Sequence, residues 1–241
     1  ASYALGAILA PHGFDVALTY GGFFLAMAAL GSVVVVVSIG AAVLVARSGV
    51  KYTDTQAARR VTHLPVGLIT MIWVAYGSGV AAGLMAIGHA AEIAATAGFA
   101  GWIAAATIAG FNLVGSLLSG WLSDRISHRH ILTTLPVIGA TALLALAVLP
   151  EQTLVLLGVV GFAYGGTIAT YPAAIANLFP GEDGPHAYGR VFTAWGAAGL
   201  VAPWLAGQIY DWTGHYTTAL WAAAALGILS AVMAQKVIRQ R

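Results

Sequence analysis

The chain has 241 residues, of which 60% are hydrophobic and only 7% are charged. A soluble domain of this length needs more charged surface, so the composition predicts an all-α polytopic membrane protein whose spans are helices. The formal net charge is only +2, and the ten Lys and Arg residues are spread over several short loops, which argues against a nucleic-acid partner. The absence of cysteine excludes disulfides, thiolate metal sites and cysteine nucleophiles.

The first part of the chain is predicted to be the end of one helical bundle, followed by a linker. Residues 1–10 are apolar but too few to cross a hydrocarbon core, which needs about twenty helical residues, and a turn is expected at 11–15. A full span is expected at 21–46. The predicted domains are 1–46, the end of an N-terminal bundle with one partial and one full span; 47–63, a cytoplasmic linker; and 64–241, a C-terminal six-helix bundle.

Six apolar runs follow the linker, each close to the length that a membrane-spanning helix needs. They lie at 64–88, 101–122, 131–149, 153–177, 191–210 and 217–237. If the runs cross alternately, all ten Lys and Arg residues fall on one face of the membrane, and the positive-inside rule makes that face cytoplasmic. The C terminus is therefore expected in the cytoplasm, with the protein in the plasma membrane, or in the inner membrane of a Gram-negative bacterium.

The segment from Gly120 to His130 concentrates charge in one short turn directly after an apolar run. Its aspartate and arginines cannot lie at bilayer depth without a large penalty, so the turn is placed at a membrane face. Gly120 followed by Asp124, Arg125 and Arg129 resembles the loop signature of the major facilitator superfamily, between the second and third helices of its C-terminal half. The resemblance implies a loop that responds to conformation. The alternative is an ordinary positively charged loop after a span.

Segments in the last third resemble one branch of that family, the oxalate/formate antiporters and monocarboxylate porters. The matching segments are 161–166, 171–172, 177–180, 188–203 and 210–216. The resemblance implies a secondary active transporter, an antiporter or symporter that moves a small organic solute such as a monocarboxylate by alternating access. It also implies that the chain is a C-terminal half, so the missing N-terminal half is an expected partner, together with the lipid bilayer. The alternative is a non-transporting membrane assembly or structural partner derived from half a transporter.

Two basic residues that anion carriers of this branch place inside the bundle are replaced in this chain. Alignment on neighbouring small residues puts Ser116 at the first position and Trp195 at the second. A dicarboxylate in a low-dielectric cavity needs opposite charge to offset its desolvation, so oxalate is not expected as the substrate. Ser127 and His128 also depart from the glycine and arginine that the family usually shows in the charged turn.

The polar and aromatic side chains of the predicted spans are candidates for a substrate cavity. Asn112, Ser116, Ser119 and Ser123 repeat at helical spacing, and a polar stripe of this kind rarely faces lipid. These candidates favour a neutral or monoanionic organic solute bound by hydrogen bonds and ring faces. Hydrogen bonding between neighbouring helices is the alternative role. The cavity candidates are Trp73, Tyr76, Asn112, Ser116, Tyr164, Tyr171 and Trp195.

His89 and Glu92 lie one helical turn apart at the outer end of the first run of the bundle. They are candidates for proton coupling, because histidine ordinarily titrates near neutrality. Capping of a helix is the alternative role. The sequence shows no metal-ligand cluster, phosphate loop or Ser/His/Asp set, so neither enzyme activity nor a cofactor is expected.

Overall fold

The computed structural model describes residues 2–49 and 64–239, and every regular element in this part of the chain is helical, which confirms the all-α prediction. A short 3₁₀ turn, Pro150–Gln152, precedes the sixth helix. The helices are α1 (Ser2–Arg47), α2 (Val66–Ile87), α3 (Ala90–Thr96), α4 (Gly101–Ser123), α5 (His128–Leu146), α6 (Thr153–Leu178), α7 (Asp183–Thr213) and α8 (Thr217–Arg239).

Helix α1 lies mostly in a compact unit of its own, Leu9–Arg60. Its two arms meet at Gly22, whose φ of 67° is open to glycine but strained for other residues. The turn predicted at 11–15 is wrong, because that segment is helical and the Thr19 hydroxyl donates to the Asp15 carbonyl one turn earlier, at 2.9 Å. The break in the helix therefore lies after this segment.

The second arm of α1 contains the span predicted at 21–46. Its run of valines, from Val33 to Val37, is 56–68% exposed, which suits a surface that faces hydrocarbon. The linker predicted at 47–63 lies outside the described residues from position 50 onward. The predicted domain boundaries therefore stay a prediction.

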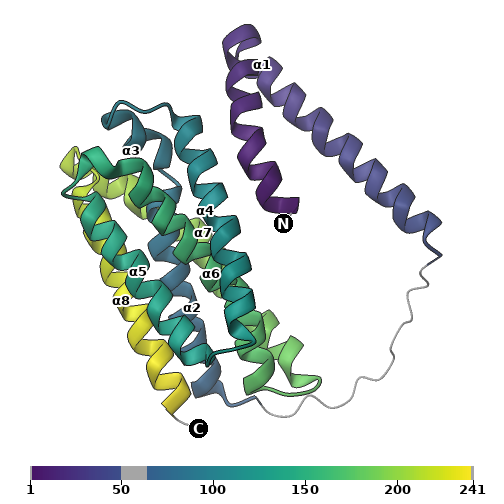
Figure 1. Ribbon diagram of the computed structural model, residues 1–241, viewed down its shortest axis with the longest axis vertical. Helices are drawn as coiled ribbons and strands as arrows, with labels where there is room; N and C mark the ends of the chain where they lie inside the picture. Colours follow the sequence, from purple (N-terminus) through teal and green to yellow (C-terminus); the bar gives the residue numbers. More distant parts are fainter. Residues whose placement is uncertain (1, 50–63, 240–241) are drawn as a thin grey trace. The chain divides into compact units, whose positions relative to one another are not determined.

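Helices α2–α8 form a bundle in which consecutive long helices run in opposite directions (Figure 1). One end, called the α3 end, holds α3 and the connections 147–152 and 214–216. The other end, called the Asp124 end, holds the connections 124–127 and 179–182 and the end of α8 (Figure 1). This helix order brings the basic residues of the described bundle to the Asp124 end. They are Arg125, Arg129, Arg190, Lys236 and Arg239.

Six described helices are long and apolar enough to cross a membrane, which supports an integral membrane protein. Five of them belong to the bundle. Helix α7 is longer than most, with 31 residues, but it is more polar and is not among the six. The span predicted at 191–210 is only the apolar part of α7, because the polar segment 183–190 continues the helix at its start. The six segments are Ala10–Arg47, Val66–Ile87, Gly101–Ser123, His128–Leu146, Pro150–Leu178 and Thr217–Val237.

Helices α4 and α6 approach closely because glycines on each face the backbone of the other. A β-carbon at Gly161 would lie 2.7 Å from the Ile108 carbonyl oxygen, and one at Gly115 would collide with the Phe162 carbonyl. Small residues allow such close packing in lipid, where apolar side chains gain little by leaving the solvent. This contact fixes the position of the polar stripe that α4 carries.

Candidate substrate cavity

A cavity of about 430 Å³ opens among helices α2, α3, α4, α6 and α7. Most of its wall consists of Ala, Gly, Leu and Ile residues. The polar side chains that line it are Glu92, Asn112, Tyr164 and Trp195, which come from four different helices. An apolar hollow of this size with a few convergent polar groups is the usual form of a small-molecule site.

Trp195 and Tyr164 form one connected part of the cavity wall. Nε1 of Trp195 donates a hydrogen bond of 3.0 Å to the Tyr164 hydroxyl. The Trp195 ring also stacks on Phe192, with centroids 5.6 Å apart and planes 4° from parallel. These contacts orient the indole while 39% of Trp195 stays exposed, so part of the ring is available to a ligand.

The polar stripe of α4 faces α6, and only part of it reaches the cavity. A β-carbon at Gly165 would lie 2.8 Å from Ser116 Oγ and 2.9 Å from Asn112 Cγ, and one at Gly166 would collide with Ser119 Oγ. Asn112 lines the cavity, whereas Ser116 and Ser119 are not among its lining residues. The stripe is therefore helix packing at the two serines and a cavity group at Asn112.

The remaining aromatic candidates lie outside this cavity. Tyr76 and Tyr171 are buried in the bundle core with ring centroids 4.5 Å apart, and neither hydroxyl has a hydrogen-bond partner. Trp73 joins α2 to α7, because its Nε1 donates to Thr193 Oγ1 at 2.9 Å. Of the seven predicted cavity residues, the structure thus brings together Asn112, Tyr164 and Trp195.

His89 fastens the end of α2 to α7 and to the connection that follows α7. A carbonyl oxygen can only accept a hydrogen bond, so His89 Nε2 must carry the proton that it donates to the Pro203 carbonyl, at 2.9 Å. Nδ1 then accepts from the Tyr216 hydroxyl, at 3.2 Å. His89 is the residue before α3, and its side chain makes no capping hydrogen bond to that helix.

Glu92 is exposed in the first turn of α3 and lines the cavity. Burial raises the pKa of the Tyr216 hydroxyl, and the nearby Glu92 carboxylate raises it further, so this tyrosine remains a proton donor to His89 at neutral pH. No hydrogen bond joins Glu92 to His89 in the described structure. Among its lining residues the cavity therefore has one carboxylate and no Lys or Arg.

The charged turn at the Asp124 end lies far along α4 from this cavity. The Arg125 guanidinium folds back on the last turn of α4, where Nη1 donates to the Trp121 carbonyl at 3.0 Å and Cζ lies 3.9 Å from the Trp121 ring centroid. Asp124 is exposed, and no ion pair or side-chain hydrogen bond with another described residue holds it. A β-carbon at Gly120 would meet nothing within 4 Å. Packing within the bundle therefore explains neither the aspartate at position 124 nor the glycine at position 120.

Sequence reasoning missed several partners of the candidate residues. Phe192 lies three residues before Trp195, so helical spacing could have paired the two rings. The side chain of Trp73 on α2 contacts Thr193, and that of His89, which follows α2, contacts Pro203 and Tyr216. No spacing within a single helix indicates such contacts.

The sequence of the bundle also matches known proteins. The family model of the Major Facilitator Superfamily matches residues 67–241, and the chain therefore belongs to this superfamily. Over 137 residues it is 28% identical to the uncharacterized MFS-type transporter YhjX of Escherichia coli (strain K12). That match covers 54% of this chain and 34% of the relative, about a third of its length. The resemblance to the oxalate/formate and monocarboxylate branch stays a prediction.

Proposed function

We propose that this bundle is one half of a secondary active transporter that moves a small organic solute across the membrane by alternating access. The observation that carries the proposal is the cavity in which Asn112, Tyr164 and Trp195 meet within an apolar wall. In transporters of this kind the solute site lies between two halves near the middle of the membrane. An N-terminal half of the same protein and the lipid bilayer are the partners that the proposal requires.

The cavity lining supports a neutral or singly charged solute, and monocarboxylates and related metabolites are the class to test first. Asn112 offers an amide, Tyr164 a hydroxyl and Trp195 a ring face. The Glu92 carboxylate at the cavity disfavours a dianion such as oxalate, which needs opposite charge in a low-dielectric site. A monocarboxylate anion would need a cation from the N-terminal half.

Uptake by the full-length transporter tests the assignment of the cavity. Asn112→Ala and Trp195→Ala should each weaken the apparent affinity for the solute by about 5- to 150-fold, because losing a buried polar partner or a ring contact costs about 1–3 kcal/mol. Trp204→Ala is the matched control, since Trp204 lies on the same helix, is 62% exposed and does not line the cavity. Saturable uptake from a panel of monocarboxylates would be measured at equal surface expression.

Equal loss of uptake in the Trp204→Ala control and the Trp195→Ala variant would contradict this cavity assignment. The complete absence of saturable uptake for every solute tested would favour a non-transporting assembly partner. Glu92→Gln tests proton coupling at the same site. If Glu92 and His89 take part, this variant should change the dependence of uptake on external pH.

We also propose that the Asp124 end faces the cytoplasm, in a plasma membrane or a Gram-negative inner membrane. The alternating helices and the basic residues at that end support this orientation. The chain lacks cysteine, so single cysteines can be introduced without a background signal. Glu182→Cys should react with an impermeant thiol reagent only from the cytoplasmic side, and Gln152→Cys only from outside. Reversed labelling would refute the orientation.

A further inference from the structure

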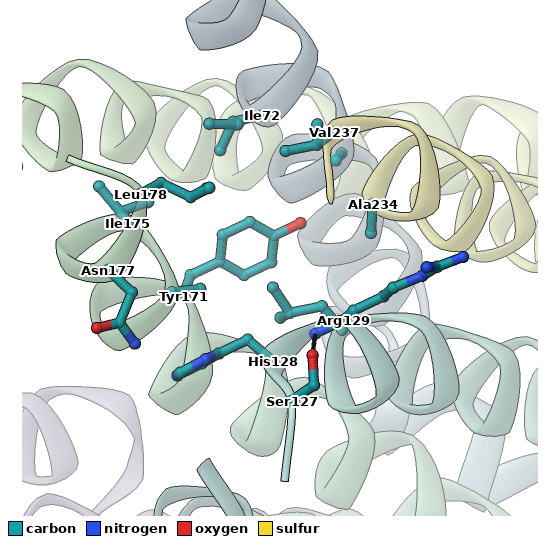
Figure 2. A pocket seen from close by; sticks show the side chains of 13 residues that line it. Ile72, Ser127, His128, Arg129, Tyr171, Ile175, Asn177, Leu178, Ala234 and Val237 are labelled. Carbon is teal, nitrogen blue, oxygen red and sulfur yellow. Dashed lines mark hydrogen bonds between the residues drawn. The ribbon is translucent and has the colours of Figure 1, made fainter. Parts of the chain in front are cut away.

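A second hollow lies at the Asp124 end of the bundle and shares no lining residue with the substrate cavity. It is a pocket of about 220 Å³ enclosed by helices α2, α5, α6 and α8 (Figure 2). Its wall is largely apolar, with Ile72, Leu132, Ile175 and Val237 from the four helices. The pocket is thus built by the ends of four helices, and its lining includes the exposed residues Ser127 and Asn177.

Unsatisfied polar atoms gather around this pocket. Four buried side-chain atoms of the described residues lack a hydrogen-bond partner: Tyr76 Oη, His128 Nε2, Thr133 Oγ1 and Tyr171 Oη. Two of these four residues, Tyr171 and His128, line the pocket, and the Tyr76 ring packs on Tyr171. Buried polar groups are nearly always hydrogen-bonded, so two exceptions in the lining of one pocket indicate that a polar ligand group belongs there.

Tyr171 is the most completely buried of the polar residues that line the pocket, at 3% exposed. In Figure 2 its ring lies centrally and its hydroxyl is directed toward Ala234 and Val237 of α8. Ser230 lies close to this hydroxyl, but its own proton is donated to the Ala75 carbonyl at 2.7 Å, so it cannot also donate to Tyr171, whose hydroxyl makes no hydrogen bond of good geometry. A neutral phenol without a partner is available to donate to an acceptor.

The charged residues that line the pocket indicate which kind of hydrogen-bond acceptor a ligand would bring. Arg129 lines the pocket, with His128 beside it, and no carboxylate is among the lining residues. The backbone N–H of Arg129 already donates to Ser127 Oγ at 3.3 Å, which anchors the start of α5, while no hydrogen bond within the described residues engages its guanidinium. A cation and a phenolic donor beside apolar walls suit a carboxylate on an apolar body.

We propose that this pocket binds a small organic monocarboxylate with an apolar body about the size of benzoate. Cavities of about 150 Å³ hold benzene, so about 220 Å³ leaves room for a ring and one carboxylate, whereas it is too small for a phospholipid. The carboxylate would accept a hydrogen bond from the Tyr171 hydroxyl, and one from the Arg129 guanidinium once that side chain turns inward from the outward orientation seen in Figure 2. The site is separate from the proposed transport cavity, and binding to it can be tested without transport, whereas the regulatory role argued next rests on the proposed function.

A bound carboxylate would favour the conformation described here. The ligand would contact all four helices that end around the pocket, beside the turn that carries Asp124. A ligand shifts a conformational equilibrium toward the state that it binds more tightly. The pocket would therefore act as a regulatory site, at which such acids slow the conformational cycle of the transporter.

Binding of 4-fluorobenzoate to the purified 241-residue chain in detergent tests the proposal, with fluorine NMR as the readout. Binding to the parent chain should be saturable, and Tyr171→Phe and Arg129→Gln should each weaken it by about tenfold or more, since each removes a hydrogen bond to a charged group. Tyr171→Phe should also raise the thermal midpoint of the ligand-free chain by about 2–4 °C, because it removes an unsatisfied buried hydroxyl. If the Tyr171 hydroxyl had only a structural role, Tyr171→Phe would change the stability of the protein but would leave ligand binding unchanged.

Matched variants distinguish binding in this pocket from binding in the transport cavity or to any exposed arginine. Tyr76→Phe should give a similar gain in stability with unchanged 4-fluorobenzoate binding, and Arg190→Gln, which removes an exposed arginine of α7, should also leave binding unchanged. Unaltered binding in both Tyr171→Phe and Arg129→Gln would overturn the proposal. Loss of binding in Asn112→Ala would also overturn it, because it would place the ligand in the transport cavity. A third contrary result would be that phosphatidylglycerol displaces 4-fluorobenzoate equally well from the parent chain and from every variant.

Discussion

The two ends of the bundle differ in how well their buried polar groups are satisfied. At the α3 end, both ring nitrogens of His89 are engaged, by the Pro203 carbonyl and the Tyr216 hydroxyl. Toward the Asp124 end, the hydroxyls of Tyr76 and Tyr171 have no partner. Since unsatisfied buried groups are costly, the described conformation is stabilised at the α3 end and strained at the Asp124 end.

The largest expected effect comes from releasing the α3 end. His89→Ala removes two hydrogen bonds and leaves the Pro203 carbonyl and the Tyr216 hydroxyl without their partner, which should lower stability by about 2–3 kcal/mol. The thermal midpoint in detergent should fall by about 5–10 °C. His215→Ala is the control, because His215 is exposed on the same connection. An equal shift in both variants would show that His89 does not fasten this end.

A smaller effect of opposite sign is expected at the Asp124 end. Thr133→Val keeps the shape of the side chain but removes a buried hydroxyl without a partner, so it should stabilise the chain by about 1 kcal/mol. Thr170→Val is the matched control, because that buried hydroxyl donates to the Gly166 carbonyl at 2.8 Å. It should destabilise the chain by about 1 kcal/mol. Destabilisation by both changes would mean that Thr133 is satisfied in the folded protein.

The spans of the bundle could be predicted because lipid imposes a length and an apolar composition on each helix. The run predicted at 153–177 corresponds to α6, Thr153–Leu178, almost residue for residue. The start of α7 was not predicted, because the polar residues 183–190 carry no apolar signal although they form the beginning of the helix. The break in α1 was placed too early, at Pro11, because the helix accommodates this proline and changes direction at Gly22.

The candidate site could be predicted only in part, because helical spacing shows which residues share a face but not what that face meets. Asn112 and Ser116 lie on one stripe, yet one lines the cavity and the other packs on Gly165. Tyr164 and Tyr171 also share a face of α6, and the structure places them at two different hollows. Their separation along the helix, about 10 Å for seven residues, decides this.

A substitution in the charged turn should change the transport rate without changing the stability of the protein. Asp124→Asn should change the thermal midpoint very little, because Asp124 is exposed and has no ion pair with a described residue. If the carboxylate stabilises another conformation through a helix end, worth about 0.3–1 kcal/mol, the transport rate of the full-length protein should change about two- to fivefold. Glu151→Gln, an exposed acid at the α3 end, serves as the control. Identical rates for Asp124→Asn and the parent would exclude this role.

The smallest expected effect is a pH dependence confined to the α3 end. The pKa of Tyr216 is raised above its ordinary value of 10, first by burial and then by Glu92, so folding favours the neutral hydroxyl. The stability that this group contributes is therefore complete below about pH 10 and is lost as the pH rises through the folded-state pKa. Tyr216→Phe should remove that component, so the difference in thermal midpoint between parent and variant should shrink as the pH rises above about 10. Because other tyrosines and lysine titrate in the same range, Tyr210→Phe is measured in parallel. A difference between parent and Tyr216→Phe that stays constant over this range would show that the Tyr216 proton does not contribute to the contact with His89.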